Sequence, residues 1–379
     1  MSQIVVLGAT GSIGRQTLAD AERLGFEVVG LGARRASDDL AQAARQWPDA
    51  AIAAVDPDPS GDRAFADEFA NRYTKGPEAL ISLARCPHST VVNGIVGSAG
   101  LEASIAALEA GNRLGLANKE SLVAGGALVL AALAAHGGTM IPIDSEHSAL
   151  FQCLVGEEPG EIERLILTAS GGPFRGRSLA QLSEITPDEA LAHPTWSMGP
   201  RITIDSATLV NKGLEVIEAH FLFGLGYDLI DVVVHPQSVV HSIVEFRDGS
   251  LKAHLGATDM RIPIQYAMTY PERAPGVLGR FPLAGHSLDF ELPDRTTFPA
   301  LDLAYQAGRG GGTLPAALNA ADEVAVAAFL DGRIRFLDIS ALLESVLDTH
   351  ERLEVTSLEV VRVADESARK AAVAWVEAR

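Results

Sequence analysis

The chain has 379 residues, with 49 acidic against 30 basic side chains and a formal net charge of −19 at pH 7. That length predicts two or three domains with a large core. The charge argues against a nucleic-acid binder, because phosphate backbones are held by clustered lysine and arginine. A phosphorylated ligand must therefore be met by a few local cations and backbone amides.

Cellular location follows from the cysteines and the first residues. Cys86 and Cys153 lack metal-like spacing and form no oxidative framework. The sequence opens directly into a strand and a glycine turn, without a signal segment, so we expect a cytoplasmic protein. The longest apolar run, Val123 to Ala135, is shorter than the ~20 residues of a membrane span, and we expect a buried helix there rather than a membrane partner.

Short β-rich runs alternate with helical runs from Gln3 to Ile143. This alternation predicts βαβ units and a parallel sheet covered on both faces. We therefore predict an α/β fold that begins with a doubly wound, Rossmann-type domain over residues 1–144.

The order of elements changes after residue 144. RLILTAS, RITID, DVVVHP, VVHSIVEFRDG and SLKAHLGA are each predicted to be strands, and an Asp-Gly turn joins the last two into a hairpin. We predict a central α+β domain over 145–270, a linker rich in proline and glycine over 271–297, and a helical domain over 298–379.

Two helices are predicted in the last domain. Apolar residues at i, i+3, i+4, i+7 and i+8 mark the first, with Asp338 placed to cap its start, and the second runs from about Leu358 to Glu377. The apolar stripe consists of Ile339, Leu342, Leu343, Val346 and Leu347.

A glycine loop, GATGSIG, follows the first predicted strand. Gly8, Gly11 and Gly14 would let the backbone turn tightly and approach a pyrophosphate at the start of the next helix. The spacing departs from the usual G-x-G-x-x-G, and a turn that binds nothing is the alternative. At the end of the second predicted strand, Arg34 and Arg35 favour NADP over NAD, unless they are simply solvated.

Two carboxylates, Asp144 and Glu146, directly follow an apolar run that is predicted to be a strand. In extended backbone, residues two apart lie on one face, so the pair could chelate a cation. Glu215, four residues after Asn211 and next to Lys212 in helical spacing, is a candidate third ligand. Oxygen ligands favour Mg²⁺ or Mn²⁺, whereas the alternative is that Asp144 or Ser145 caps a helix.

Two further stretches suit binding. TASGGPF places Ser170 and two glycines at a strand end, a backbone nest suited to phosphate. HPTWSMGP, residues 193–200, sets Trp196 and Met198 between two prolines, which suits a lid that excludes water. The alternative is that Trp196 packs in the core and that His193 is structural.

Taken together and in this order, the motifs resemble the 1-deoxy-D-xylulose 5-phosphate reductoisomerase family over essentially the whole chain. They are GATGSIG, ANKESLV, IPIDSEHSAL, TASGGPF, HPTWSMGP, DSATLVNKGLE, VVHPQSVVHSIVEF and the C-terminal PAALNAADEVAVAAFL. The resemblance implies a homodimeric enzyme that uses NADPH and Mn²⁺ or Mg²⁺. Its reaction would rearrange 1-deoxy-D-xylulose 5-phosphate and reduce the product to 2-C-methyl-D-erythritol 4-phosphate, in isoprenoid precursor synthesis.

The resemblance also assigns roles to single residues. It implies metal ligation by Asp144, Glu146 and Glu215, and substrate contacts from Lys119, Ser145, Ser170, His193, Ser206, Asn211 and Lys212, with Trp196 and Met198 on the lid. It implies cofactor contacts from Thr10, Gly11, Ser12, Ile13, Gly32, Ala33, Arg34, Asn118, Glu120 and Gly199. The family commonly has asparagine near the end of the second strand, where this chain reads GARRAS, so the contacts to the adenosine phosphate stay open.

Two other functions fit parts of this pattern. A plain NADP-dependent dehydrogenase would need no metal. A nucleotide-sensing regulatory module would bind the cofactor without turnover, and the clustered carboxylates argue against it.

Overall fold

The computed structural model describes residues 2–56, 62–196 and 198–379, which form two compact units. The first consists of Met1–Ser121, Leu128–Ser148 and Asp259–Gly279, and the second of Leu122–Ala127, Ala149–Thr258 and Arg280–Arg379. None of the helices in the described residues is long and apolar enough to cross a membrane. The predicted division at residues 144, 270 and 297 remains a prediction.

The first unit contains a seven-stranded sheet in the order β4-β3-β2-β1-β5-β6-β7, in which every neighbouring pair is parallel. Its strands are β1 (Gln3–Leu7), β2 (Glu27–Arg35), β3 (Ala51–Asp56), β4 (Tyr73–Lys75), β5 (Ser89–Asn93), β6 (Arg113–Leu116) and β7 (Thr139–Pro142). The strand order reverses direction at β1, and ligands of such sheets bind outside the carboxyl ends of the strands near that point. The doubly wound prediction is confirmed.

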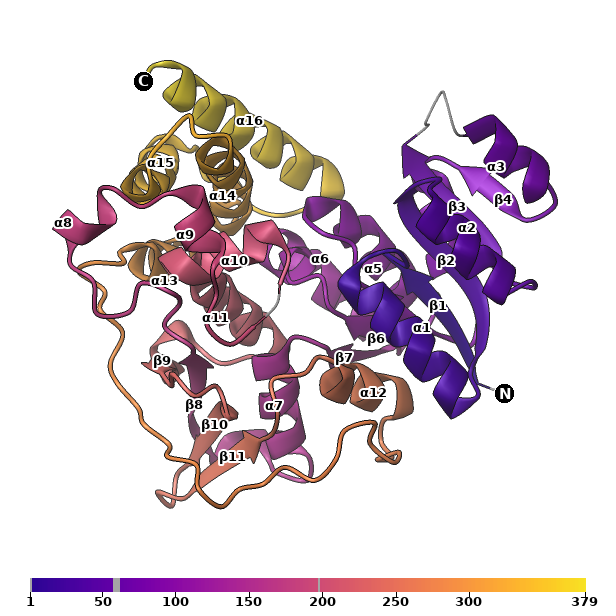
Figure 1. The fold of residues 1–379 in the computed structure, drawn as a ribbon, viewed down its shortest axis with the longest axis horizontal. Coiled ribbons are helices and arrows are strands. Elements are labelled where there is room, and N and C mark those ends of the chain that lie inside the picture. The colour runs from indigo at the N-terminus through magenta and orange to yellow at the C-terminus, as the bar shows by residue number, and fades with distance from the viewer. Residues whose placement is uncertain (1, 57–61, 197) are drawn as a thin grey trace. The chain divides into compact units, whose positions relative to one another are not determined.

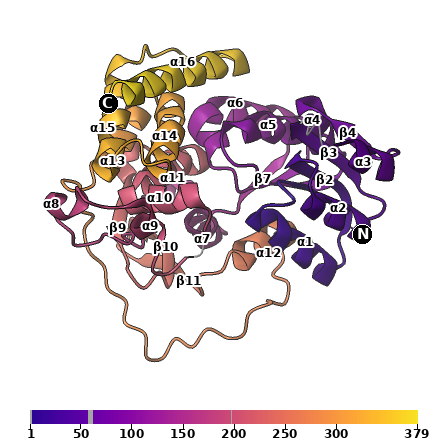
Figure 2. The same ribbon diagram turned by 45° about the horizontal axis from the view of Figure 1, so that its top comes forward.

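Helices cover both faces of this sheet. Figure 2 shows α4, α5 and α6 on one side of it and α1, α2 and α12 on the other. The helices of the unit are α1 (Ser12–Leu24), α2 (Asp38–Gln46), α3 (Asp62–Glu68), α4 (Pro77–Ala84), α5 (Leu101–Glu109), α6 (Glu120–His136) and α12 (Arg261–Thr269), with a short 3-10 turn, η1, at Ser98–Gly100. Burial on both faces explains the nearly continuous apolar run of β1, and it also buries every residue of β5, including the polar Ser89, Thr90 and Asn93.

The second unit contains a four-stranded sheet in the order β11-β10-β8-β9. Its strands are β8 (Ile162–Ala169), β9 (Ile230–Val234), β10 (Val240–Phe246) and β11 (Leu251–Leu255), and the predicted hairpin is the antiparallel pair β10 and β11. The helical segments before and around this sheet are α7 (Ser145–Leu154), η2 (Pro159–Glu161), α8 (Leu179–Leu182), α9 (Pro187–Leu191), α10 (Pro200–Thr208), α11 (Val210–Phe223) and η3 (Tyr227–Leu229) (Figure 1).

The strand predicted over RITID is wrong, because these residues lie in α10. The alternation of isoleucine and threonine is too short to separate a strand from a helix. Gly199 caps the helix and Pro200 fits its first turn, where no backbone N–H is needed. The hydroxyl of Thr203 donates to the carbonyl of Gly199 over 2.9 Å, which accommodates a β-branched residue inside the helix.

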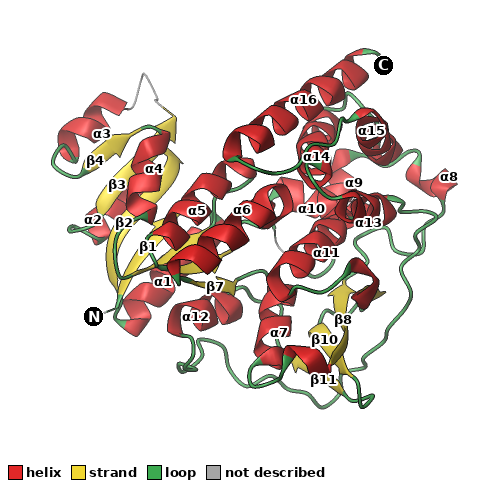
Figure 3. Cartoon of the chain, turned by 180° about the vertical axis from the view of Figure 1, so that it is seen from behind, coloured by secondary structure: helices red, strands yellow, loops and turns green. Residues whose placement is uncertain are grey.

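Four helices complete the second unit: α13 (Ala300–Gly310), α14 (Leu314–Leu330), α15 (Phe336–Thr349) and α16 (Leu358–Glu377) (Figure 3). The apolar stripe predicted for α15 is buried in one core that also includes residues of α11 and β8. Asp338 is not the capping residue itself, because α15 begins at Phe336. Instead, its carboxylate accepts the backbone N–H of Arg335 over 2.9 Å.

Candidate active site

Lys119 and Asp144 lie at the carboxyl edge of the parallel sheet. Lys119 follows β6 and Asp144 follows the neighbouring strand β7, so the topology brings the two side chains together. Nζ of Lys119 lies 2.7 Å from Oδ2 of Asp144, and both side chains are largely buried, at 8% and 12% exposure. The basic residue therefore stands directly beside the first predicted metal ligand.

The charge state of Asp144 is set by its neighbours. Burial alone would raise the pKa of this carboxyl, but Lys119 and His147 outweigh burial and hold the pKa well below its ordinary value. Asp144 is therefore an anion at neutral pH, as a cation ligand must be. Its Oδ1 atom is buried and has no hydrogen-bond partner among the described residues.

The three predicted metal ligands come together at the start of α7 and on α11. Leu150 of α7 and Leu214 of α11 both belong to the apolar core of the second unit. Asp144, Glu146 and Glu215 each offer a carboxylate oxygen, and these atoms lie within 4.8 Å of one another. Three clustered carboxylates, one of which has a buried oxygen without a hydrogen bond to any described residue, fit a hard divalent cation such as Mg²⁺ or Mn²⁺.

The helix-capping alternative accounts for only part of this geometry. The backbone carbonyl of Asp144 does accept the N–H of Ser148 over 2.8 Å, as at a helix start. Its carboxylate, however, faces Lys119 and His147. Ser145 donates its hydroxyl to Glu146 over 2.6 Å, which orients that carboxylate.

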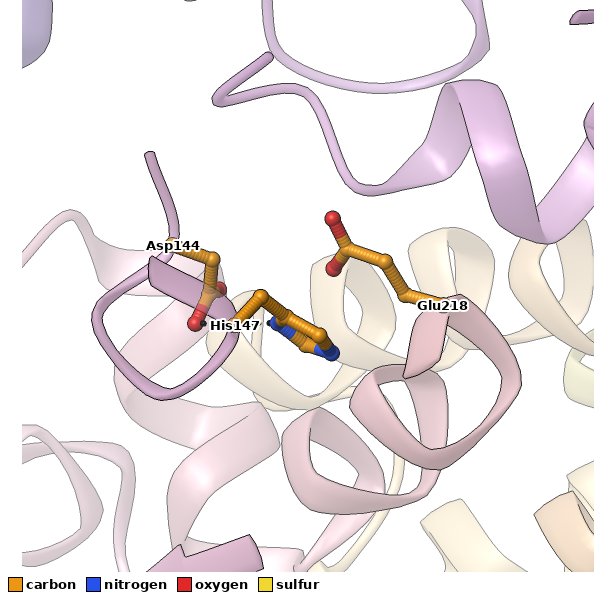
Figure 4. A group of neighbouring side chains, drawn as sticks. All are labelled: Asp144, His147 and Glu218. Carbon is orange, nitrogen blue, oxygen red and sulfur yellow. Dashed lines mark ion pairs between the residues drawn. The ribbon is translucent and has the colours of Figure 1, made fainter. Parts of the chain in front are cut away.

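Two residues of this site were missed in the sequence. His147 and Glu218 are fully buried, and Figure 4 shows their side chains next to that of Asp144. Nδ1 of His147 lies 3.5 Å from Oδ1 of Asp144, and the three residues form a second possible ligand group. The spacing of three residues from Asp144 to His147, and from Glu215 to Glu218, was the signal that could have identified them.

Lys212 and Asn211 surround Glu215 on α11. Nζ of Lys212 forms a buried ion pair with one oxygen of Glu215, and Nδ2 of Asn211 donates to the other over 2.5 Å. Both residues were predicted to contact substrate. In this structure they hold the third carboxylate in place.

Ser170 and His193 form a second polar group, after β8. Nδ1 of His193 accepts the backbone N–H groups of Thr195 and Trp196, over 3.2 and 3.0 Å, so its ring proton lies on Nε2. Nε2 then donates to the hydroxyl of Ser170 over 3.0 Å. Burial lowers the pKa of His193 and keeps the ring neutral.

The predicted phosphate nest beside Ser170 is a turn of two glycines. Gly171 and Gly172 both have positive φ, 82° and 67°, so the chain turns sharply over Ser170–Gly172, and the N–H of Gly172 donates to the hydroxyl of Ser170 over 3.2 Å. A Cβ atom on Gly172 would lie 2.8 Å from the carbonyl oxygen of Ser206 and 3.0 Å from Cα of Ala207. The end of α10 that carries Ser206 therefore packs directly on the nest.

The predicted lid spans 193–200, and Ser197 within it lies outside the described residues. Trp196 is half-buried, with its ring centroid 6.3 Å from that of His241, and Met198 is also half-buried. Burial lowers the pKa of His241 to about 4, so the ring beside Trp196 is neutral. Gly199 caps α10 and joins the segment to that helix.

The glycine loop has the shape expected of a dinucleotide site. A Cβ on Gly8 would lie 2.6 Å from the carbonyl oxygen of Gly94, and one on Gly14 would lie 2.2 Å from that of Gly8. Gly11 caps α1 without a side-chain hydrogen bond, which leaves the amides of the first turn, near Ser12 and Ile13, for a ligand. The carbonyl of Thr10 accepts from Arg15 over 2.6 Å.

The cofactor residues predicted on β2 also lie in the first unit, whereas Gly199 lies in the second. Gly32 accepts the N–H groups of Gly8 and Ala9, over 2.8 Å each, and Ala33 is buried in β2. Arg34 is exposed and pairs with Asp56 over 2.8 Å, while Arg35 lies 3.9 Å from the same carboxylate.

Asn118 and Glu120 belong to a buried network beside the end of β5. Asn118 donates to the carbonyls of Ile95 and Gly97, over 2.7 and 2.8 Å, and to Glu120 over 2.8 Å. Glu120 in turn accepts the N–H of Gly97 over 3.2 Å. The network fixes the loop that follows the strand-order switch point.

Known proteins resemble the chain over its whole length. Models described as 1-deoxy-D-xylulose 5-phosphate reductoisomerase, its C-terminal domain, and DXP reductoisomerase C-terminal domain match residues 4–126, 140–223 and 255–371. The 1-deoxy-D-xylulose 5-phosphate reductoisomerase of Pelotomaculum thermopropionicum is 49% identical over 384 residues, which cover 98% of this chain and 98% of that protein.

Solved structures agree with this match. The reductoisomerase from Zymomonas mobilis in complex with NADPH is 42% identical, covers 100% of both chains and has a TM-score of 0.93. A DOX-P reductoisomerase in complex with NADPH, fosmidomycin and magnesium is 39% identical, with 100% of this chain and 98% of that chain covered and a TM-score of 0.93. The chain belongs to the 1-deoxy-D-xylulose 5-phosphate reductoisomerase family.

Proposed function

We propose that the chain catalyses the NADPH- and divalent-metal-dependent isomerisation and reduction of 1-deoxy-D-xylulose 5-phosphate to 2-C-methyl-D-erythritol 4-phosphate. The observation that carries this proposal is the cluster of Asp144, Glu146 and Glu215, in a chain that also has a dinucleotide-type glycine loop. Related enzymes have been solved with NADPH and with magnesium, which supports the same cofactors here.

The three carboxylates would hold Mg²⁺ or Mn²⁺. The cation supplies Lewis acidity toward the carbonyl and hydroxyl oxygens of a hydroxyketone. Lys119, 2.7 Å from Asp144, keeps that ligand ionised and offers a positive charge or a proton donor next to the reacting oxygens.

The phosphate of the substrate would bind at the nest beside Ser170. The hydroxyl of Ser170 accepts from the ring of His193 and from the N–H of Gly172, which leaves its own proton to donate to the phosphate, and the N–H of Gly171 and the hydroxyl of Ser206 are proposed as further donors. Lys212, the cation of the motif DSATLVNKGLE, and its neighbour Asn211 would also contact the phosphate. Binding the phosphate away from the reacting carbons supplies energy that orients those carbons.

NADPH would bind at the glycine loop and at the end of β2. The first turn of α1, whose backbone N–H groups have no capping side chain, suits the pyrophosphate. Arg34 suits the 2'-phosphate because guanidinium groups bind phosphate with two parallel hydrogen bonds. The remaining contacts are proposed for Thr10, Gly11, Ser12, Ile13, Gly32, Ala33, Asn118, Glu120 and Gly199. Trp196 and Met198 would close over the reacting groups and exclude water.

Two alternatives remain distinguishable from this proposal. A plain NADP-dependent dehydrogenase would not use the buried carboxylates, and a nucleotide-sensing module would show no turnover. The test incubates the protein with NADPH, Mg²⁺ and 1-deoxy-D-xylulose 5-phosphate and identifies the product by mass spectrometry and NMR. Stoichiometric 2-C-methyl-D-erythritol 4-phosphate supports the proposal, whereas NADPH binding without this product would contradict it.

A homodimer and a cytoplasmic location belong to the same proposal. Strand β11 is an edge of the second unit's sheet, and its residues Leu251 and Leu255 are exposed, at 61% and 38%. An exposed edge with apolar side chains favours pairing with a second copy. The mass in solution, measured by analytical ultracentrifugation, tests this, and a monomer at micromolar concentration would count against the dimer. Cys86 and Cys153 are free, which agrees with a reducing compartment.

A further inference from the structure

An ion cluster in the second unit joins α10 to two C-terminal helices. The guanidinium of Arg201, in the first turn of α10, donates to Asn319 over 2.8 Å, to Asp322 over 3.2 Å and to Glu323 over 3.0 Å. All three partners lie on α14. One side chain of α10 is thus held by three acceptors of another helix.

The cluster extends along α10 and on to α16. Nε of Arg201 lies 3.7 Å from Oδ2 of Asp205, one turn further along the same helix. Arg369 of α16 contacts Glu323 over 2.6 Å and Asp365 over 2.6 Å. Arg369 therefore binds the same α14 carboxylate as Arg201, and its ion pairs join α14 and α16.

The cluster is acidic and mostly buried. Four carboxylates meet two guanidinium groups, and the side chains of Asp322 and Asp205 are only 0% and 5% exposed. Burial raises the pKa of Asp322 to about 6, against the opposing effect of Arg201. Removing Arg201 would leave Asp205, Asp322 and Glu323 close together without the cation they share, and such a change displaces the helices that carry them.

The end of helix α10 packs directly on the phosphate nest. Ser206 directly follows Asp205, and the Cβ position of Gly172 lies 2.8 Å from the carbonyl oxygen of Ser206. There is no free space between the end of α10 and the nest, so a shift of α10 by a few tenths of an ångström moves Ser206 relative to Ser170. The other end of α10 begins at Gly199, in the predicted lid.

We propose that Arg201, through its contacts with Asp205 and α14, is a positioning residue that holds Ser206 against the Ser170–Gly172 nest and so sets affinity for the substrate's phosphate group. This inference rests on the proposed function, because it takes the nest as the phosphate site. It assigns a substrate-binding role to a cluster whose C-terminal members do not belong to that site.

The test compares Arg201→Met with Arg369→Met. Both changes remove one guanidinium from Glu323, but only the first removes a contact to α10. Arg201→Met should raise the KM for 1-deoxy-D-xylulose 5-phosphate about ten-fold, since small displacements of positioning groups cost one to two powers of ten. The KM for NADPH should stay within about two-fold of wild type. Arg369→Met should leave both KM values within the same range, even if it lowers the unfolding midpoint.

A second variant serves if Arg201→Met does not fold. In that case, the double variant with Arg201→Met and Asp322→Asn takes its place in the comparison. The added change removes one of the three crowded carboxylates. Equal effects of Arg201→Met and Arg369→Met on the substrate KM, or an equal rise in both KM values for Arg201→Met, would overturn the inference.

Direct binding separates this inference from the proposed function. Calorimetric titration with inorganic phosphate should give a weaker Kd for Arg201→Met than for Arg369→Met and wild type. Absence of wild-type turnover would contradict the proposed function alone, and the phosphate titration would still decide whether Arg201 positions an anion site. Equal phosphate Kd values in all three proteins would reject the positioning role.

Discussion

Gly172→Ala tests whether the end of α10 and the nest form one binding surface. Gly172 has φ 67°, and an added Cβ would lie 2.8 Å from the carbonyl oxygen of Ser206. The left-handed backbone costs alanine about 1 kcal/mol, and forcing the contact apart adds about 1 to 3 kcal/mol. Because the clashing atoms are backbone, relief requires α10 to move away, which displaces Ser206.

Gly176→Ala is the matched control. Gly176 has a similar φ of 79°, but a Cβ there meets no atom within 4 Å. We expect it to lose about 1 kcal/mol of unfolding free energy, measured in urea, with an unchanged substrate KM. Gly172→Ala should lose about 2 to 4 kcal/mol and raise the substrate KM about ten-fold, with an unchanged KM for NADPH. The same stability loss and the same KM values in the two variants would refute the reasoning.

Three further predictions address charge, the lid and the cofactor. The raised pKa of Asp322, about 6 against an ordinary 3.8, means that the contribution of this one group to stability is fully present below pH 3.8 and is lost as the pH rises through about 6, by on the order of 3 kcal/mol. Asp322→Asn should therefore flatten the free energy of unfolding between pH 4.5 and 7, and an unchanged slope would contradict the assignment. Trp196→Ala should lower kcat/KM about ten-fold if the half-buried ring closes the site, and unchanged steady-state constants would reject the lid. Arg34→Ser should weaken the Kd of NADPH about ten-fold but not that of NADH, and an equal change for both would remove the phosphate-reading role.

Local patterns were sufficient where one structural signal dominated. The apolar run of β1 is buried from Ile4 to Leu7, and the stripe from Ile339 to Leu347 is buried in a helix. The short run RITID had no such signal. Its alternation predicted a strand, whereas Gly199 and Pro200 favour a helix start, and packing on α11 and α14 stabilises the helix.

The candidate site was predictable only in part. Asp144 and Glu146 were identified by their place after a strand, and Glu215 by its helical spacing from Asn211. His147 and Glu218 were missed, because a lone histidine or glutamate in sequence does not reveal that it is fully buried. The contacts of Arg201 with α14 join residues more than one hundred positions apart, and no local pattern indicates such a pair.

Metal dependence of turnover tests the central claim most directly. NADPH oxidation driven by 1-deoxy-D-xylulose 5-phosphate would be followed after chelation and after return of Mg²⁺ or Mn²⁺, in wild type and in Glu215→Gln. We predict that wild-type turnover vanishes on chelation and returns with metal, and that Glu215→Gln needs at least about ten-fold more metal, because it removes one of three charged ligands. Turnover that survives chelation, or an unchanged metal requirement in Glu215→Gln, would contradict the account.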